Sequence, residues 1–187
     1  MYKTTIRFSQ SKILCEPGGD TIWYLLDCCG QEEEKIMTLC RERLSDAAVK
    51  DAFILTYDRM LRYAGAWHME RRLLFPSYVF LESSHEETLF RKIQECNCIA
   101  GQKNQLDKVG YEEERFLKRL CGEGRHLKMS RGIIRKGTTK ITEGPLKGME
   151  NRIRRIDRHK RLARVETALR PDGHFILAGL EITEKIV

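Results

Sequence analysis

This 187-residue sequence has no long apolar run, and its first residues do not have the pattern of a secretory signal peptide. No run approaches the roughly 18 consecutive apolar residues of a membrane-spanning helix, and residues 1–20 have scattered polar side chains where a signal peptide needs an apolar core. The 41% hydrophobic and 33% charged composition is typical of a globular protein and excludes collagen and wholesale disorder. We therefore expect a cytoplasmic protein with no membrane partner.

The residue patterns of common metal and catalytic sites are also absent. The seven cysteines are an odd number, and neither Cys28-Cys29 nor Cys96-Asn97-Cys98 has zinc-ligand spacing. The segment after His85 lacks the second histidine of an HExxH helix, and there is neither a Walker-type loop nor a GxSxG elbow. We expect reduced thiols, no metal, no cofactor and no enzymatic activity.

Positive charge is concentrated in one part of the chain. The net charge is +7, but residues 125–164 alone contain fourteen Lys/Arg and three acids, so this segment is +11 and the remainder is −4. Dense like charge repels itself and destabilises a fold unless a partner neutralises it. The asymmetry favours two modules, one of which binds a polyanion, over the alternative of a solvated basic face.

The first part of the chain predicts an α+β sandwich with a mixed sheet. Residues 1–20 form a lead that we leave unassigned. Short apolar runs predict strands at 21–28, 52–57 and 78–81, and a basic hairpin or extended loop at 59–74. Apolar residues at helical spacing predict helices at 31–44, 85–96 and 110–121. This domain covers residues 21–122.

The second part predicts a small β-barrel. Residues 123–137 are basic and low in large apolar residues, as in a linker, although Ile133-Ile134 would suit a short strand. Four strand-like patterns then follow at 138–144, 151–157, 161–169 and 174–182. Turn residues separate them, so residues 138–187 read as a barrel of short strands.

Two of these barrel strands combine buried aliphatic residues with outward arginines. Ile153, Ile156, Leu162 and Val165 alternate with or flank the arginines, and the turn at 157–161 carries four possible cations. A guanidinium can hold a phosphate or a guanine edge with two hydrogen bonds. A projecting basic loop enters an RNA groove best at a bulge, a loop or a helix end. Structured RNA is therefore the expected ligand.

Several motifs resemble those of the NusG family. Thr142 to Gly148, followed by Ile153 and Ile156, resembles the KOW motif, and Trp23-Tyr24 and Phe75 to Phe80 resemble the WY and FPGY signatures of the NusG N-terminal (NGN) domain. The family's FPGY glycine is Ser77 here, and its second KOW glycine is Asn151, a residue that tolerates the left-handed conformation. The resemblance implies an NGN α/β sandwich joined by a linker to a KOW β-barrel.

The basic string from Gly144 to Glu166 resembles the specialised branch of that family that includes LoaP and the UpxY-type proteins. This resemblance implies a monomeric factor for transcription antitermination and elongation. Its NGN domain would bind the clamp of the largest catalytic subunit of RNA polymerase, and its KOW domain would bind a hairpin in the nascent leader RNA. Two alternatives remain open: a general NusG-like elongation factor, or a ribosome-associated KOW protein that binds RNA.

The resemblance also assigns residues to partners. The expected contacts with RNA polymerase, or their supports, are Trp23, Tyr24, Phe75, Pro76, Tyr78 and Phe80. The possible contacts with upstream DNA are Arg59, Arg62, Arg71 and Arg72. The expected RNA contacts are Lys147, Arg152, Arg154, Arg155, Arg158, His159, Lys160, Arg161 and Arg164, together with Arg131, Lys136 and Lys140.

Overall fold

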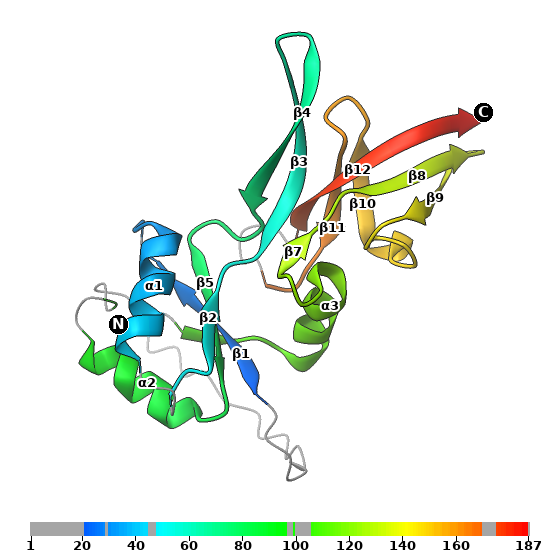
Figure 1. The fold of residues 1–187 in the computed structure, drawn as a ribbon. Coiled ribbons are helices and arrows are strands. Elements are labelled where there is room, and N and C mark those ends of the chain that lie inside the picture. The colour runs from blue at the N-terminus through cyan, green and yellow to red at the C-terminus, as the bar shows by residue number, and fades with distance from the viewer. Residues whose placement is uncertain are drawn as a thin grey trace, which may run out of the picture.

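The computed structural model describes residues 21–28, 30–44, 48–96, 99, 106–169 and 175–186. This part of the chain is a mixed α+β protein with three sheets and three α-helices (Figure 1). The predicted α+β class is confirmed. No helix within these ranges is long and apolar enough to cross a membrane.

The amino-terminal sheet is a four-stranded layer with the order β2-β5-β1-β6. Its strands are β1 (Ile22–Asp27), β2 (Asp51–Phe53), β5 (Tyr78–Ser83) and β6 (Leu106–Lys108). The sequence predicts a mixed sheet, but all three strand pairs here are antiparallel. Parallel pairs occur in the other two sheets. The direction of pairing could not be predicted, because a strand's partner lies far away in the sequence and its local residue pattern does not reveal that partner.

Both faces of this sheet are covered, which explains why β1 is continuously apolar. Tyr24 and Leu26 point into a core shared with α1 (Glu33–Arg43) and α2 (Glu86–Glu95). Trp23 and Leu25 point into a second core shared with α3 (Tyr111–Cys121). Alternation in a strand sends successive side chains to opposite faces, so a strand buried on both sides needs apolar residues throughout.

A long hairpin leaves this layer and extends beside the rest of the molecule (Figure 1). It consists of β3 (Thr56–Tyr63) and β4 (Ala66–Leu73), and with β7 (His126–Leu127) it forms a sheet of order β4-β3-β7. The strand expected at 52–57 is therefore divided. β2 ends at Phe53, and the chain crosses to a different sheet before Thr56.

The C-terminal sheet has five strands in the order β10-β11-β12-β8-β9. They are β8 (Ser130–Arg135), β9 (Thr138–Glu143), β10 (Ile153–Asp157), β11 (Leu162–Glu166) and β12 (Phe175–Ile186), with a 3-10 turn at Glu150–Arg152. The 123–137 segment expected as a linker instead contains β7 and β8. β8 lies inside the sheet because it pairs in parallel with β12, a partner some 50 residues away.

One continuous core joins the two parts of the molecule. Phe116 and Leu117 of α3 belong to the same buried cluster as Leu146, Met149 and Val165 of the C-terminal part. Domains joined only by a flexible linker would each have a separate core. The C-terminal sheet is therefore packed against α3, which fixes its position relative to the hairpin.

Candidate nucleic-acid interface

The C-terminal sheet presents two arginines directly opposite each other. Arg155 on β10 pairs in register with Arg164 on β11, and Leu177 on β12 is the next residue along the same row. Both arginines are exposed, and neither has a carboxylate within ion-pair distance in the described part of the chain. Like charges at directly opposite positions destabilise a sheet. An anion lying across the pair would remove that cost.

The hairpin docks on the edge of this row. Asp58 of β3 accepts hydrogen bonds from His126 at 2.8 Å and from the Met129 backbone N–H at 3.0 Å. Gly179 of β12 lies so close that an added Cβ would be 2.5 Å from the Asp58 carbonyl oxygen. Only glycine allows this approach of two backbones. The docking places hairpin arginines beside Arg155 and Arg164.

Two neighbouring clefts lie between the hairpin and the C-terminal sheet. One cleft of about 510 Å³ is lined by Arg59, Arg71 and Arg72, and an adjoining one of about 260 Å³ by the cations Arg155, Lys160 and Arg164. Arg59 and Leu177 line both clefts, so the two are neighbours. We call this surface the arginine groove and define it by Arg59, Arg72, Arg155, Lys160 and Arg164.

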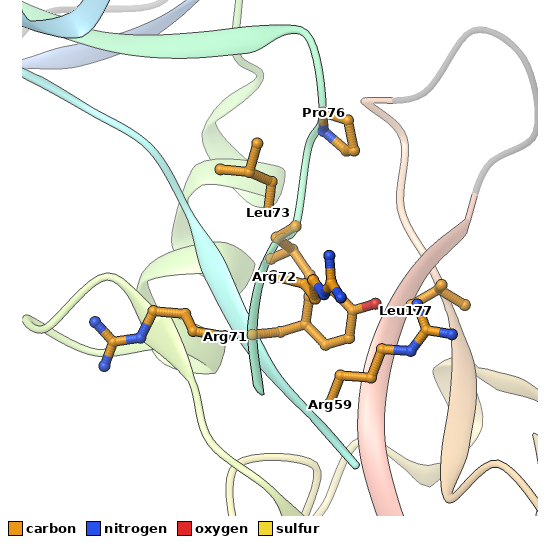
Figure 2. A pocket seen from close by; sticks show the side chains of 8 residues that line it. Arg59, Arg71, Arg72, Leu73, Pro76 and Leu177 are labelled. Carbon is orange, nitrogen blue, oxygen red and sulfur yellow. The ribbon is translucent and has the colours of Figure 1, made fainter. Parts of the chain in front are cut away.

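The hairpin arginines do not all point into the groove. Arg59 and Arg72 lie on the side of Leu177, whereas Arg71 points to the opposite side of the strand (Figure 2). The Nε atom of Arg59 is buried without a hydrogen-bond partner among the described residues. An unpaired buried N–H costs free energy. Arg59 is thus a cation that the described part of the protein does not neutralise.

Two acids limit the positive charge of the groove. Glu70 forms an ion pair with Arg72, and Asp157 accepts a hydrogen bond from the Lys160 backbone N–H at 3.0 Å. That hydrogen bond lowers the pKa of Asp157. Burial raises the pKa of the Tyr57 hydroxyl on the groove floor, although the nearby arginines oppose the shift. The floor is therefore neutral and largely apolar beneath a basic rim.

Arg161 connects the C-terminal sheet to the hairpin rather than pointing into the groove. Its guanidinium lies 4.1 Å from the centre of the Trp67 ring and 3.0 Å from a carboxylate oxygen of Glu181. Its side chain is only 25% exposed. The sequence assigns Arg161 to RNA, but these contacts give it a structural role as a clamp between β4 and β12.

Replacing Arg161 with alanine is expected to loosen this clamp. The loss of a partly buried cation–π contact and of the Glu181 pair is worth about 1 to 2 kcal/mol. Trp67 should become more accessible to acrylamide in fluorescence quenching, because the other tryptophan, Trp23, stays buried. Arg158→Ala in the same turn is the control, since Arg158 is exposed. Equal quenching in both variants would contradict the clamp.

Arg152 and Arg154 also bind acids of the protein. Arg152 lies 3.4 Å from the buried Glu113 of α3 and stacks on Phe116 with its guanidinium 4.0 Å from the ring centre. Glu113 accepts a further hydrogen bond from Thr167. Arg154 pairs with Glu166. Arg152 therefore fastens the C-terminal sheet to α3, and Arg154 is partly neutralised.

The other predicted RNA contacts are spread over the surface. Arg158 and His159 are exposed in the turn between β10 and β11, next to the groove. Lys140 is exposed on β9, at the opposite edge of the sheet from β10. Four of the predicted RNA contacts lie on or next to strands β8 and β9: Arg131, Lys136, Lys140 and Lys147. Arg131 faces Glu143 at 3.7 Å and Glu181 at 3.5 Å.

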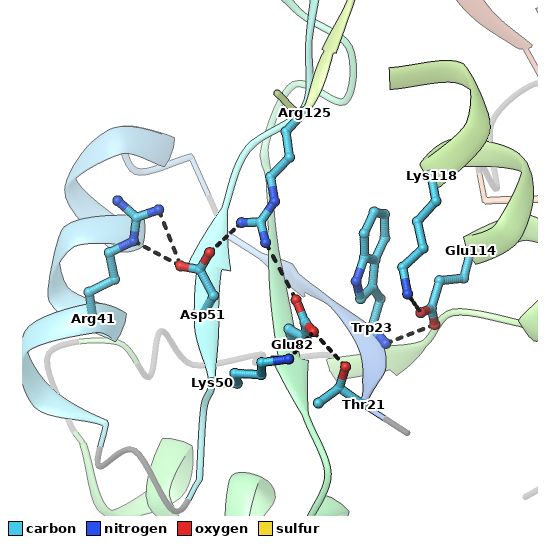
Figure 3. Close-up of polar contacts among 9 residues, drawn as sticks. All are labelled: Thr21, Trp23, Arg41, Lys50, Asp51, Glu82, Glu114, Lys118 and Arg125. Carbon is cyan, nitrogen blue, oxygen red and sulfur yellow. Dashed lines mark hydrogen bonds and ion pairs between the residues drawn. The ribbon is translucent and has the colours of Figure 1, made fainter. Parts of the chain in front are cut away.

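The predicted polymerase residues are mostly core residues. The buried members are Trp23, Tyr24, Phe75 and Phe80, each at most 4% exposed. Trp23 packs edge-on against Phe53 and Phe80, and its backbone N–H donates to Glu114 at 3.1 Å (Figure 3). Pro76 is exposed and Tyr78 is half-buried. Only these two reach the surface, so the other four can act only as supports in this structure.

Arg125 is the first cation of the basic segment, yet it ties the amino-terminal sheet together. It pairs with Asp51 of β2 and, at 3.4 Å, with Glu82 of β5 (Figure 3). Its guanidinium also lies 3.4 Å from the centre of the Phe53 ring. Lys50 also pairs with Glu82, at 3.3 Å. The segment's high charge thus overstates the number of cations available to a ligand.

Glu82 makes the stability of this sheet depend on pH. Burial alone would raise the pKa of Glu82, but hydrogen bonds from Thr21 and Lys50 and the nearby positive charges outweigh it and lower the pKa. Its stabilising contribution is therefore complete above its unfolded pKa of about 4.3 and is lost as the pH falls through the lower folded value. The stability difference between wild type and Glu82→Gln should be largest at neutral pH and shrink below about pH 4. Urea unfolding at a series of pH values tests this, and a constant difference would contradict it.

Comparison with known proteins gives no match for this sequence, either among protein-family models or among curated proteins. The ligand of the groove has to be inferred from its chemistry. In the described part of the chain, no group of three or more His, Cys, Asp or Glu is placed to hold a metal ion. What the groove offers is unneutralised guanidinium groups around an apolar floor, which suits phosphates and bases.

Sequence reasoning missed part of this site. It assigned Arg59 to DNA and Arg155 and Arg164 to RNA, whereas one groove contains all three. It did not identify Tyr57 or Leu177 as floor residues. The signal that could have pointed to the docking is Gly179, a glycine inside a strand pattern, which often marks a close approach of another backbone.

Proposed function

We propose that this protein is a NusG-type factor for transcription antitermination and elongation, with an NGN domain followed by a KOW domain. The NGN domain binds RNA polymerase, and the arginine groove binds a structured leader RNA. No bond is made or broken. By bridging the cleft of the polymerase, the bound factor opposes the opening that pausing and termination require, and RNA binding directs it to selected long operons.

The observation that carries this proposal is the opposed pair Arg155 and Arg164, neither of which has an ion-pair partner among the described residues, in one cleft with Arg59. Arginine forks bind phosphates with two hydrogen bonds. The groove is open and has an apolar floor, so it suits a distorted or unpaired stretch of RNA better than a regular duplex, whose major groove is deep and narrow.

Two backbone conformations support the family assignment. Gly144, directly before Pro145, has φ +92°, and a Cβ there would overlap Ser130. Ser77, at the position of the family's FPGY glycine, has φ +71°. Both positions thus have the left-handed conformation that glycine favours. Asn151, by contrast, lies in a 3-10 turn without positive φ, and the second left-handed glycine of this loop is Gly148.

The proposed polymerase contact centres on the exposed turn before β5. Pro76 and Tyr78 supply the surface, and the aromatic core beneath them, including Phe75 and Phe80, holds its shape. Upstream DNA would meet the hairpin at Arg62, which is exposed on its distal half.

Transcription in vitro by a bacterial RNA polymerase tests the proposal. Templates would contain an intrinsic terminator behind the leader of a neighbouring long operon, or behind the same leader with its hairpin sequence shuffled. The full chain should increase terminator readthrough only with the native hairpin, and the protein should be retained on immobilised polymerase. Equal readthrough on both templates would favour a general elongation factor. RNA binding without retention on polymerase would favour a ribosome-associated protein.

A further inference from the structure

The tip of the β3–β4 hairpin holds a pair of stacked rings, of which Tyr63 is exposed and His68 is half-buried. The centres of the Tyr63 and His68 rings are 3.7 Å apart and their planes differ by 15°. Tyr63 is 53% exposed. The two-residue turn between the strands has φ +49° at Ala64 and +78° at Gly65, the conformation of a tight hairpin turn. The rings are thus held in place at the end of a regular hairpin.

The charge around this stack suits a polyanion. Residues 59–69 contain two arginines and no acid. Arg62 is exposed and has no carboxylate within ion-pair distance in the described ranges, but it pairs in register with Trp67 and so lies on the face of β3 opposite to Tyr63. The cation on the same face as Tyr63 is Arg59 of the arginine groove, and an exposed aromatic ring on the same face as such a cation suits a nucleobase attached to phosphates. A purely apolar peptide segment would leave those charges without a partner.

The stack lies on the same face of β3 as the arginine groove. Arg59, Leu61 and Tyr63 alternate along one face, so Tyr63 is about 13 Å from Arg59 along the strand. On the other face, the guanidinium of Arg161 already covers Trp67. The Tyr63 side is therefore the aromatic surface that a strand leaving the groove would meet.

We propose that the Tyr63–His68 stack is a platform for an unpaired nucleobase of the strand whose phosphates lie in the arginine groove. This inference rests on the proposed function and adds a second subsite to it. The base stacks on the exposed face of Tyr63, and His68 supports the ring from behind. Stacking does not depend on base identity, so the platform selects for an unpaired position rather than for a sequence.

The test compares two RNAs that share one stem, one closed by an unpaired loop and one fully paired. Tyr63→Leu should weaken binding of the looped RNA by about 5- to 100-fold and leave the paired RNA unchanged. Tyr63→Phe keeps the ring and should bind like wild type. Tyr111→Leu is the matched control, because Tyr111 is an exposed tyrosine on α3. A 2-aminopurine in the loop should lose fluorescence on binding to wild type but not to Tyr63→Leu.

The outcomes separate this proposal from the proposed function. If wild type binds looped RNA and Arg155→Ala weakens it, but Tyr63→Leu has no effect, the platform is overturned while the groove stands. The platform is also overturned if Tyr63→Leu weakens binding of the looped and the paired RNA equally. It is likewise overturned if Tyr63→Leu loses retention on polymerase while its 2-aminopurine signal stays like that of wild type. No binding of any RNA or of the corresponding DNA loop overturns both. Binding of RNA and DNA loops with the same Tyr63 dependence supports a platform that recognises the base alone.

Discussion

Replacing both Arg155 and Arg164 with alanine is expected to weaken binding of a leader hairpin by about 100-fold or more, because two charge-assisted contacts are lost. If each arginine neutralises one phosphate, the slope of log K against log salt should also become shallower by about 1.4 to 1.8. Fluorescence titration of the full chain at several salt concentrations measures both quantities.

The same double variant should fold as well as wild type. Arg155 and Arg164 are exposed and directly opposite, so removing them relieves a like-charge contact. A control with the same loss of charge is Arg43→Ala with Arg91→Ala, on helices α1 and α2 away from the groove. If the control weakens RNA binding as much as the groove variant, the net charge rather than the groove binds RNA.

Gly179→Ala is expected to destabilise the protein by about 1 to 3 kcal/mol, which lowers the melting temperature by several degrees. A Cβ at this position would be 2.5 Å from the Asp58 carbonyl oxygen and would also overlap Met129. The hairpin would have to move away from β12. Because the groove lies between them, RNA binding should weaken together with stability.

The control is Gly124→Ala, where a Cβ would meet no atom within 4 Å and φ is not in the left-handed region. Thermal unfolding and RNA titration of both variants separate the two effects. If Gly179→Ala melts and binds RNA like Gly124→Ala, the hairpin is not docked against β12 as described, and the groove loses its basis.

Local sequence patterns predict most elements to within a few residues. The helices expected at 31–44, 85–96 and 110–121 correspond to α1, α2 and α3, and three of the later strand patterns contain β9, β10 and β11. The pattern at 174–182 covers only the first part of β12, which continues to Ile186. Helical spacing, alternation and turn residues act over a few positions, so they can be read directly. Short strands such as β6, with three residues, lack enough pattern to be recognised.

Strand partners could not be read in this way. The segment that contains β8 reads as a linker because it is basic and low in large apolar residues, with only Ile133-Ile134 suited to a short strand. Its pairing with β12 nevertheless places β8 inside the C-terminal sheet. The strand expected at 52–57 looked continuous, but two of its parts belong to different sheets. Strands pair with segments that are far apart in the sequence. The residues of one short segment therefore do not identify its partner strand.

The sequence by itself determined the α+β class and the concentration of cations in residues 125–164, and it contains the motifs from which we propose a NusG-type function. Only the tertiary structure decided what each arginine does. Arg125, Arg152 and Arg161 are held by carboxylates and aromatic rings of the protein itself. Arg155 and Arg164 have no such partner in the described chain, and the docked hairpin adds Arg59 to them. The reason is physical: a charge is available to a ligand only where folding has brought no opposite charge beside it.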